Sequence, residues 1–339
     1  MSSRRILIVA VNWLGDLLFM SPAIRSIRRA HPDSHIVCLV APRGLDLLAG
    51  NPHLNEVIAW EEGRGVAGWL KILPLAHRLR AGRFDTAVLF HRSFSRTLAA
   101  WLAGIPSRVG YRTWKRGWLL TTLVEPPEKD SVHKAEWLLR LVGAAGIVPA
   151  GMQYDAGILP EDTRHAEDLI QAMKVAAGES LVALHAGANW RLKRWPPGHF
   201  ARLADGLAEK FGARVLFIGG SEDLPLIRGI AGRMRTEPLV AAGRTTFRQM
   251  GALLARTRLL ISNDSGPLHM GIAVGVPVVA LFGPTKPELT GPPPGAKAVT
   301  LFGSIGCPVP CYRLNCPANL CMGQISVEQV LDAAARFLK

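Results

Sequence analysis

Short apolar runs alternate with amphipathic stretches along the first half of the chain. The runs predict buried strands at Arg4–Val11, Ser34–Ala41, Glu56–Trp60 and Thr86–Phe90. Between and after them, apolar positions recur at helical spacing, which predicts helices at Asp16–His31, Trp69–Ala81, Ser95–Ala103 and Lys134–Gly146. Strands and helices that alternate in this way are typical of a parallel sheet with helices on both faces.

The second half repeats this pattern after a stretch without periodicity. Residues 148–163 (VPAGMQYDAGILPEDT) are rich in Pro and Gly, as linkers are. Beyond them the pattern predicts strands at 181–185, 214–219, 259–261 and 276–282, and helices at 200–211, 224–234, 246–255, 269–274 and 327–338. We therefore expect an α/β protein with two Rossmann-like parallel-sheet domains, residues 1–155 and 156–325, that face a central cleft. Residues 326–339 are expected to form a last helix that packs on the first half.

Length and charge narrow the function further. The 339 residues are enough for two cores, and the 49% hydrophobic content indicates a folded protein. The net charge of +14 indicates a polyanionic partner: nucleic acid, an anionic membrane surface or an acidic substrate. No apolar run approaches the roughly 20 residues that span a bilayer. The basic N-terminus before an apolar run is unlike a signal peptide, because the run is broken at Asn12 and Asp16. We expect a cytoplasmic protein, peripheral to the membrane.

The most informative polar loop lies at residues 262–267 (SNDSGP), between an apolar strand and a helix of small residues. In doubly wound sheets, ligands bind outside the carboxyl ends of the strands. A helix N-terminus also attracts phosphate. Asp264, Ser265, Gly266 and His269 are therefore candidates for a nucleotide or nucleotide-sugar site. The alternative, that Asp264 or Ser265 only caps the helix, is compatible with this.

Two more loops follow predicted strands of the second half. The loop HAGANWRLKRWP suits a diphosphate: Lys193 supplies a point charge, Arg194 a bidentate donor and Asn189 a further polar contact. Its alternative is a solvated basic loop. Glu222, in GGSED, occupies a position where acidic residues accept hydrogen bonds from ribose. Helix capping is equally plausible there.

The first half has two candidate regions. Asn12, Gly15 and Asp16 follow the first strand, where Asp16 can accept a proton from an attacking hydroxyl or simply cap the helix. No G-x-G-x-x-G fingerprint is present. The region 91–118 is basic and aromatic, which suits acidic acceptor groups, or RNA, whose bases stack on aromatic rings. Its candidate acceptor contacts are Arg92, Arg96, Arg112 and Lys115.

Four of the five cysteines lie close together in the sequence, at Cys307, Cys311, Cys316 and Cys321. Their spacing is wider than that of paired zinc knuckles. We expect reduced thiols and no metal, with a structural metal site as the alternative.

Together these motifs resemble glycosyltransferase family 9. The segments that carry the resemblance are NWLGDLLFMSPAIRSIR, KRWPPGHFARLADGL, SNDSGPLHMGIAVGVPVVALFGPT and CPVPCYRLNCPANLCMGQISVEQV. They cover nearly the whole chain in the family's order. Within the family they are similar to the ADP-heptose:lipopolysaccharide heptosyltransferases, and NWLGD with KRWP resembles the second type more than the first.

The resemblance implies a GT-B fold, with the acceptor on the N-terminal domain and the nucleotide sugar on the C-terminal domain. It implies metal-independent, inverting transfer without a cofactor. Asp16 then matches the general base, Lys193 the lysine on the donor diphosphate, and Asp264, Ser265 and Gly266 the loop over the nucleotide sugar. His269 matches a histidine behind that loop, and Glu222 an acidic residue near the ribose.

The implied partners are ADP-heptose, an inner-core acceptor of Kdo and heptose on lipid A, and the anionic inner face of the cytoplasmic membrane. A monomer that binds no nucleic acid is expected. The alternatives within enzymes are a heptosyltransferase of the first type, another family 9 transferase, or a nucleotide-sugar epimerase. Outside enzymes, the charge leaves an RNA-binding protein as an alternative.

Overall fold

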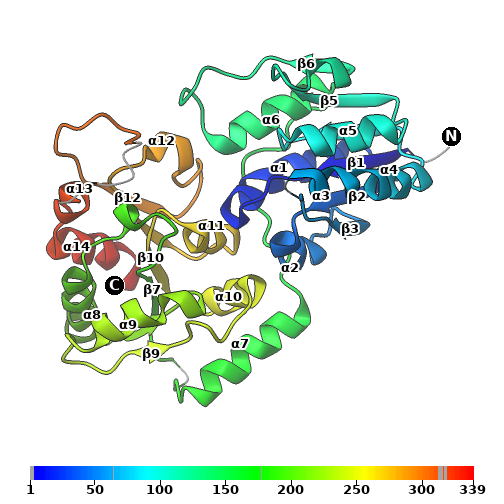
Figure 1. The fold of residues 1–339 in the computed structure, drawn as a ribbon. Coiled ribbons are helices and arrows are strands. Elements are labelled where there is room, and N and C mark those ends of the chain that lie inside the picture. Colours follow the sequence, from blue (N-terminus) through cyan, green and yellow to red (C-terminus); the bar gives the residue numbers. More distant parts are fainter. Residues whose placement is uncertain (1–3, 64, 177, 312–315, 317–318) are drawn as a thin grey trace. The chain divides into compact units, whose positions relative to one another are not determined.

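The computed structural model describes residues 4–63, 65–176, 178–311, 316 and 319–339. The chain divides into two compact units, residues 1–157 and 158–339, so the boundary lies two residues beyond the expected one. Each unit has its own six-stranded sheet and its own helices on both faces of that sheet (Figure 1). All strand pairings among the described residues are parallel, as the alternating pattern predicts.

The first unit is built on six strands in the order β3-β2-β1-β4-β5-β6. The strands are β1 (Arg5–Val9), β2 (His35–Val40), β3 (Glu56–Ala59), β4 (Thr86–Leu89), β5 (Ser107–Tyr111) and β6 (Thr122–Val124). The helices are α1 (Leu14–Ala30), α2 (Leu45–Ala49), α3 (Gly65–Leu70), α4 (Ile72–Ala81), α5 (Phe94–Leu102) and α6 (Lys134–Ala144), with short 3₁₀ turns η1 (Pro42–Gly44) and η2 (Gly117–Leu119).

The central strands of the first unit are buried on both faces, which is why they read as continuous apolar runs. Alternate residues of β1 and β2, such as Leu7 opposite Val37, form one cluster with Leu75 of α4 and Ala99 of α5. The residues between them are equally buried. In the same unit, α1 packs against α6.

The second unit has the strand order β12-β11-β10-β7-β8-β9. Its strands are β7 (Leu181–His185), β8 (Arg214–Phe217), β9 (Leu239–Val240), β10 (Leu259–Asn263), β11 (Val278–Phe282) and β12 (Ala298–Phe302). Its helices are α7 (Pro160–Ala172), α8 (Pro197–Phe211), α9 (Leu224–Ala231), α10 (Phe247–Leu254), α11 (Gly266–Ala273), α12 (Pro287–Thr290), α13 (Leu320–Gly323) and α14 (Val327–Leu338), with 3₁₀ turns η3 (Arg191–Lys193) and η4 (Ser221–Asp223).

Helix α14 completes the core of the second unit. Its buried residues Val330 and Leu331 join a cluster that contains Leu203 of α8 and Leu184 of β7. The helix packs directly on α8. Residues 326–339 therefore belong to the second unit and are no separate segment, and the packing of this helix on the first half stays a prediction.

Both sheets share one topology. Read from β3 and from β9, each follows the Rossmann order 3-2-1-4-5-6, so the direction of winding reverses between β1 and β4 and between β7 and β10. In such sheets ligands bind at the carboxyl ends of the two strands that flank this reversal. The polar loops after these four strands are therefore the places where a site is expected.

Some elements differ from the sequence prediction. Helix α7 begins at Pro160, inside the stretch expected to be a linker, because Pro is favoured in the first turn of a helix. Strands β5, β6, β9 and β12 were not predicted from the sequence. Among the described residues, no helix combines the length and apolarity needed to cross a membrane.

Candidate active site

An ion pair lies at the reversal point of the second sheet. Lys193, in the loop after β7, and Asp264, directly after β10, are brought together because these two strands are neighbours. Lys193 Nζ donates to Asp264 Oδ2 at 2.6 Å. The Asp264 side chain is nearly fully buried, whereas Lys193 remains partly exposed. The two residues expected to hold the donor thus meet, with the cation on the accessible side.

The Asp264 carboxylate is the centre of a larger network. Its Oδ2 also accepts from Thr285 Oγ1 at 2.7 Å and from Thr290 Oγ1 at 3.3 Å, and its Oδ1 lies 3.8 Å from His269 Nε2. Burial raises the pKa of Asp264, but the charges of Lys193 and His269 and these hydrogen bonds outweigh burial and lower the pKa overall. The carboxylate is therefore ionised at neutral pH and fixes the Lys193 ammonium.

The N-terminus of α11 is not capped by the side chain of its N-cap residue. Ser265 occupies the N-cap position but makes no side-chain hydrogen bond to the helix amides. Its Oγ instead lies 3.0 Å from His185 Nδ1 and donates to the Asn263 carbonyl at 3.1 Å. Asp264 is engaged by Lys193 and the two threonines. The capping alternative for this loop is thus wrong, and the helix terminus faces the site with its positive end.

A second carboxylate stands behind Ser265, and the sequence reading missed it. Asp223 Oδ2 lies 3.6 Å from His185 Nε2, and both side chains are buried. A Cβ atom on Gly187 would lie 2.2 Å from Asp223 Oδ1, so any side chain there would displace the Asp223 carboxylate. Burial raises the pKa of Asp223, but the hydrogen bond and charge of His185 and the Gly220 amide lower it overall. The two glycines of GGSED, upstream of Asp223, were the one local feature of the sequence that could have pointed to this residue.

Three other expected donor contacts lie outside the hydrogen-bond network described above for Asp264. Arg194 Nε and Nη2 both donate to the Ala188 carbonyl, at 3.0 and 2.8 Å, so the guanidinium braces its own loop. Asn189 is exposed at the tip of that loop, and Glu222 is exposed in η4 beside the buried Asp223. Of the acidic pair in GGSED, the second residue is the one that the fold turns inward.

The reversal point of the first sheet carries a polar cluster. Asn12 follows β1 and His91 follows β4, and Asn12 Nδ2 lies 2.9 Å from His91 Nε2. Arg96 donates to the Asn12 Oδ1 at 2.8 Å and to the Ala10 carbonyl at 2.9 Å. Arg96 is only 1% exposed. Its expected role as an acceptor contact is therefore corrected: Arg96 is buried on α5, where its hydrogen bonds to Asn12 and to the Ala10 carbonyl position the Asn12 side chain.

Charges within this cluster are balanced by Glu62, which follows β3. Ser93 Oγ donates to Glu62 Oε1 at 2.6 Å, and Ser95 Oγ donates to the same oxygen. Burial raises the pKa of Glu62, but these hydrogen bonds and Arg96 lower it overall. Burial and the charge of Arg96 lower the pKa of His91 to about 4, so its imidazole is neutral at pH 7.

Asp16 lies in the first turn of α1, near the same strand end. The N-cap of this helix is Trp13 and not Asp16, so the capping alternative for Asp16 is wrong. Asp16 Oδ1 accepts from Lys134 Nζ at 3.0 Å, and both side chains are partly exposed. Gly15 occupies the same turn. Lys134, the first residue of α6, lies 118 residues away and has no sequence pattern that links it to Asp16.

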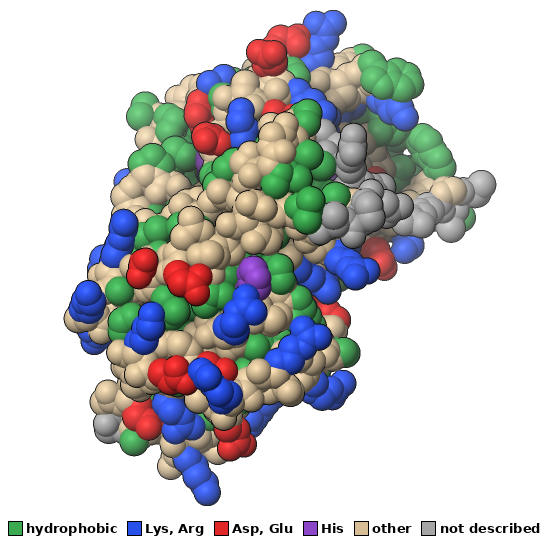
Figure 2. Space-filling view, turned by 90° about the vertical axis from the view of Figure 1, so that its left-hand side faces the viewer, with side chains coloured by type: hydrophobic (Ala, Val, Ile, Leu, Met, Phe, Trp, Pro, Cys, Tyr) green, Lys and Arg blue, Asp and Glu red, His purple; other side chains and the backbone are tan. Residues whose placement is uncertain are grey.

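The remaining basic candidates are exposed at the surface. Arg92 lies over the Trp137 ring at 5.8 Å, Lys115 over Trp114 at 4.9 Å, and Arg112 pairs with Glu125 at 3.0 Å. On the face shown in Figure 2, lysine and arginine side chains are scattered among acidic ones and form no continuous stripe. A continuous basic stripe is what an RNA-binding protein would present.

The family model of glycosyltransferase family 9 (heptosyltransferase) matches residues 72–321. The chain belongs to this family. The matched range contains Lys193, Asp264 and all four clustered cysteines. Membership identifies the chain as a glycosyltransferase and decides between the enzyme and RNA-binding alternatives in favour of the enzyme.

Relatives in the family match over most of their length. Lipopolysaccharide heptosyltransferase 2 of Escherichia coli K12 is 30% identical over 313 residues, which are 85% of either chain. Among solved structures, a family 9 glycosyltransferase of Veillonella parvula superposes with a TM-score of 0.87 at 26% identity, covering 99% of this chain and 97% of that one. The E. coli ADP-heptose lps heptosyltransferase II gives 0.82 at 25%, covering 98% of each. The two parallel sheets are thus those of the expected GT-B fold.

Proposed function

We propose that this protein transfers a heptose, with inversion, from ADP-heptose to the heptose of the lipopolysaccharide inner core. The observation that carries the proposal is the Lys193–Asp264 pair beside the N-terminus of α11, whose N-cap side chain does not cap it. A fixed ammonium and a helix N-terminus together suit a diphosphate leaving group. The names of the relatives, heptosyltransferase 2 of lipopolysaccharide and lipooligosaccharide, support the choice of sugar and acceptor.

On the donor side, charge develops on ADP as the bond between the anomeric carbon and the diphosphate oxygen breaks. Lys193 meets that charge and is held in place by Asp264, and the α11 amides at Ser265 and Gly266 add their dipoles. Donors fixed before the reaction need no reorganisation as the charge forms. His185 and Asp223 hold Ser265 from behind. His269 supports Asp264 in the same way that His185 supports Ser265.

On the acceptor side, Asp16 takes the proton of the attacking heptose hydroxyl, whose oxygen forms the new glycosidic bond. Lys134 holds one carboxylate oxygen, Oδ1, which orients the other towards the acceptor. Asn12 presents an amide fixed by Arg96. The exposed Arg92, Arg112 and Lys115 meet the acidic groups of the acceptor. No step in this scheme uses a metal or cofactor, and the enzyme acts as a monomer.

Transfer to two purified acceptors tests the proposal. One acceptor ends in Kdo and the other in Kdo-heptose, and mass spectrometry reads the product. A gain of one heptose on the Kdo-heptose acceptor alone is expected. A gain on the Kdo acceptor alone would move the enzyme to the first heptosyltransferase type, and no gain on either would overturn the substrate.

The first unit carries an exposed aromatic surface that supports an association with the membrane. Trp69, Phe94, Trp118 and Trp101 follow one another with ring centres 6.0, 6.5 and 6.2 Å apart, and we name them the tryptophan surface. Its three tryptophans are 44–66% exposed. Basic residues such as Lys115 and Arg112 lie close by in the sequence. Tryptophans beside cations suit the interface of an anionic bilayer, so the enzyme would act at the inner, cytoplasmic face of the membrane.

Sedimentation with anionic vesicles checks this association. Binding is expected to weaken as salt rises, because surface charges are screened. The double variant W101S/W118S is expected to stay in the supernatant, and W190S, on the second unit, serves as the matched control. Equal sedimentation of W101S/W118S and wild type would contradict the role of the tryptophan surface.

A further inference from the structure

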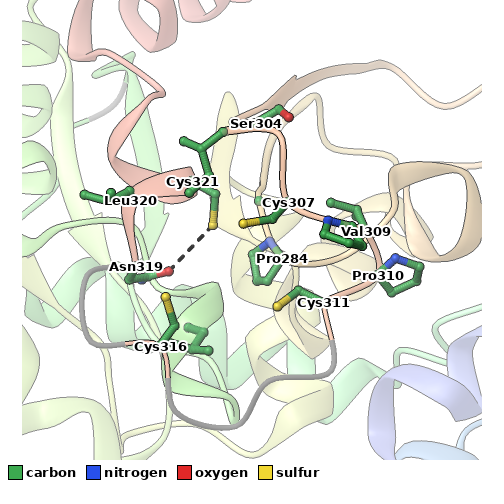
Figure 3. A pocket seen from close by; sticks show the side chains of 15 residues that line it. Pro284, Ser304, Cys307, Val309, Pro310, Cys311, Cys316, Asn319, Leu320 and Cys321 are labelled. Atoms are coloured by element: carbon green, nitrogen blue, oxygen red, sulfur yellow. Dashed lines mark hydrogen bonds between the residues drawn. The ribbon is translucent and has the colours of Figure 1, made fainter.

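A pocket lies at the carboxyl ends of β11 and β12. Its volume is about 290 Å³, and its lining includes Gly283 and Pro284 after β11, Gly303 and Ser304 after β12, and the segment that follows. All four clustered cysteines line it, and we call it the four-cysteine pocket. Figure 3 shows their thiols turned towards the same space.

Two of the four cysteines are fixed to the sheet. The Cys311 amide donates to the Pro284 carbonyl at 2.7 Å, directly after β11. Cys321 lies on α13, and a Cβ atom on Gly303 would lie 1.9 Å from the Cys321 carbonyl oxygen. The helix backbone therefore touches the end of β12. Cys307 and Cys316 complete the lining from the connecting segments.

The chemistry of this pocket is that of sulfur. None of the four cysteines forms a disulfide. All four line one pocket, so their sulfur atoms face a common space. Four thiolates around one ion are the ligand set of tetrahedral zinc and of related thiophilic metals.

We propose that the four-cysteine pocket binds one thiophilic divalent cation, Zn²⁺ in the first place, as a structural site. In the described part of the chain, no three His, Cys, Asp or Glu side chains lie close enough together to hold a metal ion. Metal binding therefore requires the four sulfur atoms to move towards one another, until each Zn–S distance is about 2.3 Å. The four thiols lose their protons as the metal–sulfur bonds form.

Such a site would brace the donor loops, a consequence that rests on the proposed function. Leu192, next to Lys193, lines the pocket, and Asn319 Nδ2 donates to the Arg194 carbonyl at 3.3 Å. On the other side, Pro284 precedes Thr285, whose hydroxyl donates to Asp264. The pocket thus touches the loops of both partners of the Lys193–Asp264 pair. A metal there would fix their separation.

Metal content of the full-length protein tests the site without any donor or acceptor. The protein is purified from zinc-supplemented cultures and analysed by mass spectrometry of the elements. About one zinc per chain is expected, as in structural four-cysteine sites. C316S is expected to lose it, whereas the control C38A, at a cysteine buried in β2, retains it. Absence of zinc with four titratable thiols, or disulfides between these cysteines, would overturn the proposal.

A measurement on the unmodified chain covers the case in which C316S does not fold. A chelator removes the metal, and Co²⁺ is added to the apoprotein. Charge-transfer bands of thiolate-bound Co²⁺ are expected, and their absence would count against the site. ADP should bind on the order of tenfold more weakly to the apoprotein, and zinc should restore the affinity. Unchanged ADP affinity would leave the metal site but remove its bracing role, whereas the metal readouts are independent of the proposed reaction.

Discussion

Lys193 and Asp264 lie 71 residues apart in the sequence, yet the Lys193 ammonium and the Asp264 carboxylate are 2.6 Å apart. Parallel pairing of β7 with β10 places the two strand ends side by side and so creates this contact. The carboxylate is buried and the ammonium is partly exposed. A buried anion thus holds a cation at the surface of the site, where a diphosphate can reach it.

Removal of the anion is expected to weaken the second unit. D264N replaces a carboxylate that accepts from Lys193, Thr285 and Thr290 by an amide that cannot accept the same set of bonds. Hydrogen bonds to charged groups are worth about 1.5–3 kcal/mol, and a loss of that size in urea unfolding is expected. E136Q breaks the exposed pair with Arg140 and should cost about 0.5 kcal/mol or less. Similar losses for both variants would refute the central role of Asp264.

The depressed pKa of His91 should make the folded protein less stable in mild acid. In the folded protein its pKa is about 4, whereas the ordinary value is 6.5. Between these values the unfolded chain binds more protons at this residue than the folded chain does, so stability falls as the pH drops from about 6.5 to about 4. H91Q should remove this part of the pH dependence, while H77Q, at an exposed histidine of α4, should leave it. A His91 NMR titration near 6.5 would contradict the prediction.

Asp16 is expected to be needed for turnover but not for donor binding. A general base contributes about 10²–10⁴ in rate, so D16N should lower kcat by that factor. Calorimetry should give the same Kd for ADP as wild type. D33N, at an exposed aspartate after α1, is the matched control and should retain full turnover. Retained activity in D16N would remove the general-base role.

The glycine beside Asp223 should tolerate no side chain. A Cβ atom at Gly187 would lie 2.2 Å from the Asp223 carboxylate, so G187A must displace buried groups. Overpacking of this kind costs about 1–3 kcal/mol. G143A, in α6, meets no atom within 4 Å and should be neutral or stabilise the protein by up to about 1 kcal/mol. Equal stability of G187A and wild type, measured by urea unfolding, would show that Asp223 can move.

The central strands and the loops after them could be predicted from the sequence because they are apolar runs followed by polar residues. Two of the edge strands, β6 and β9, could not, because they have three and two residues and such short segments carry little periodicity. Helix α7 was hidden because its first residue, Pro160, is also a common linker residue.

Within the site, residues adjacent to a strand end were predictable, and their partners were not. Asp16 and Asp264 follow strands, so their place was visible in the sequence. Lys134, at the start of α6, and Asp223, in η4, come from other segments, and only the fold brings them in. Arg96 shows the opposite error: a charged residue in a basic region looked exposed, but it is buried because the Asn12 and Ala10 oxygens accept its hydrogen bonds.

The shared strand order of the two sheets bears on how this enzyme can be re-engineered. Within the described residues, no strand of one sheet pairs with a strand of the other, and the second unit closes its own core with α14. A chimera joined at residues 157 and 158 would therefore keep every ladder intact. If the first unit binds the acceptor, as proposed, exchange of residues 1–157 with the same half of another family member would change the receiving sugar and leave the nucleotide-binding half unchanged.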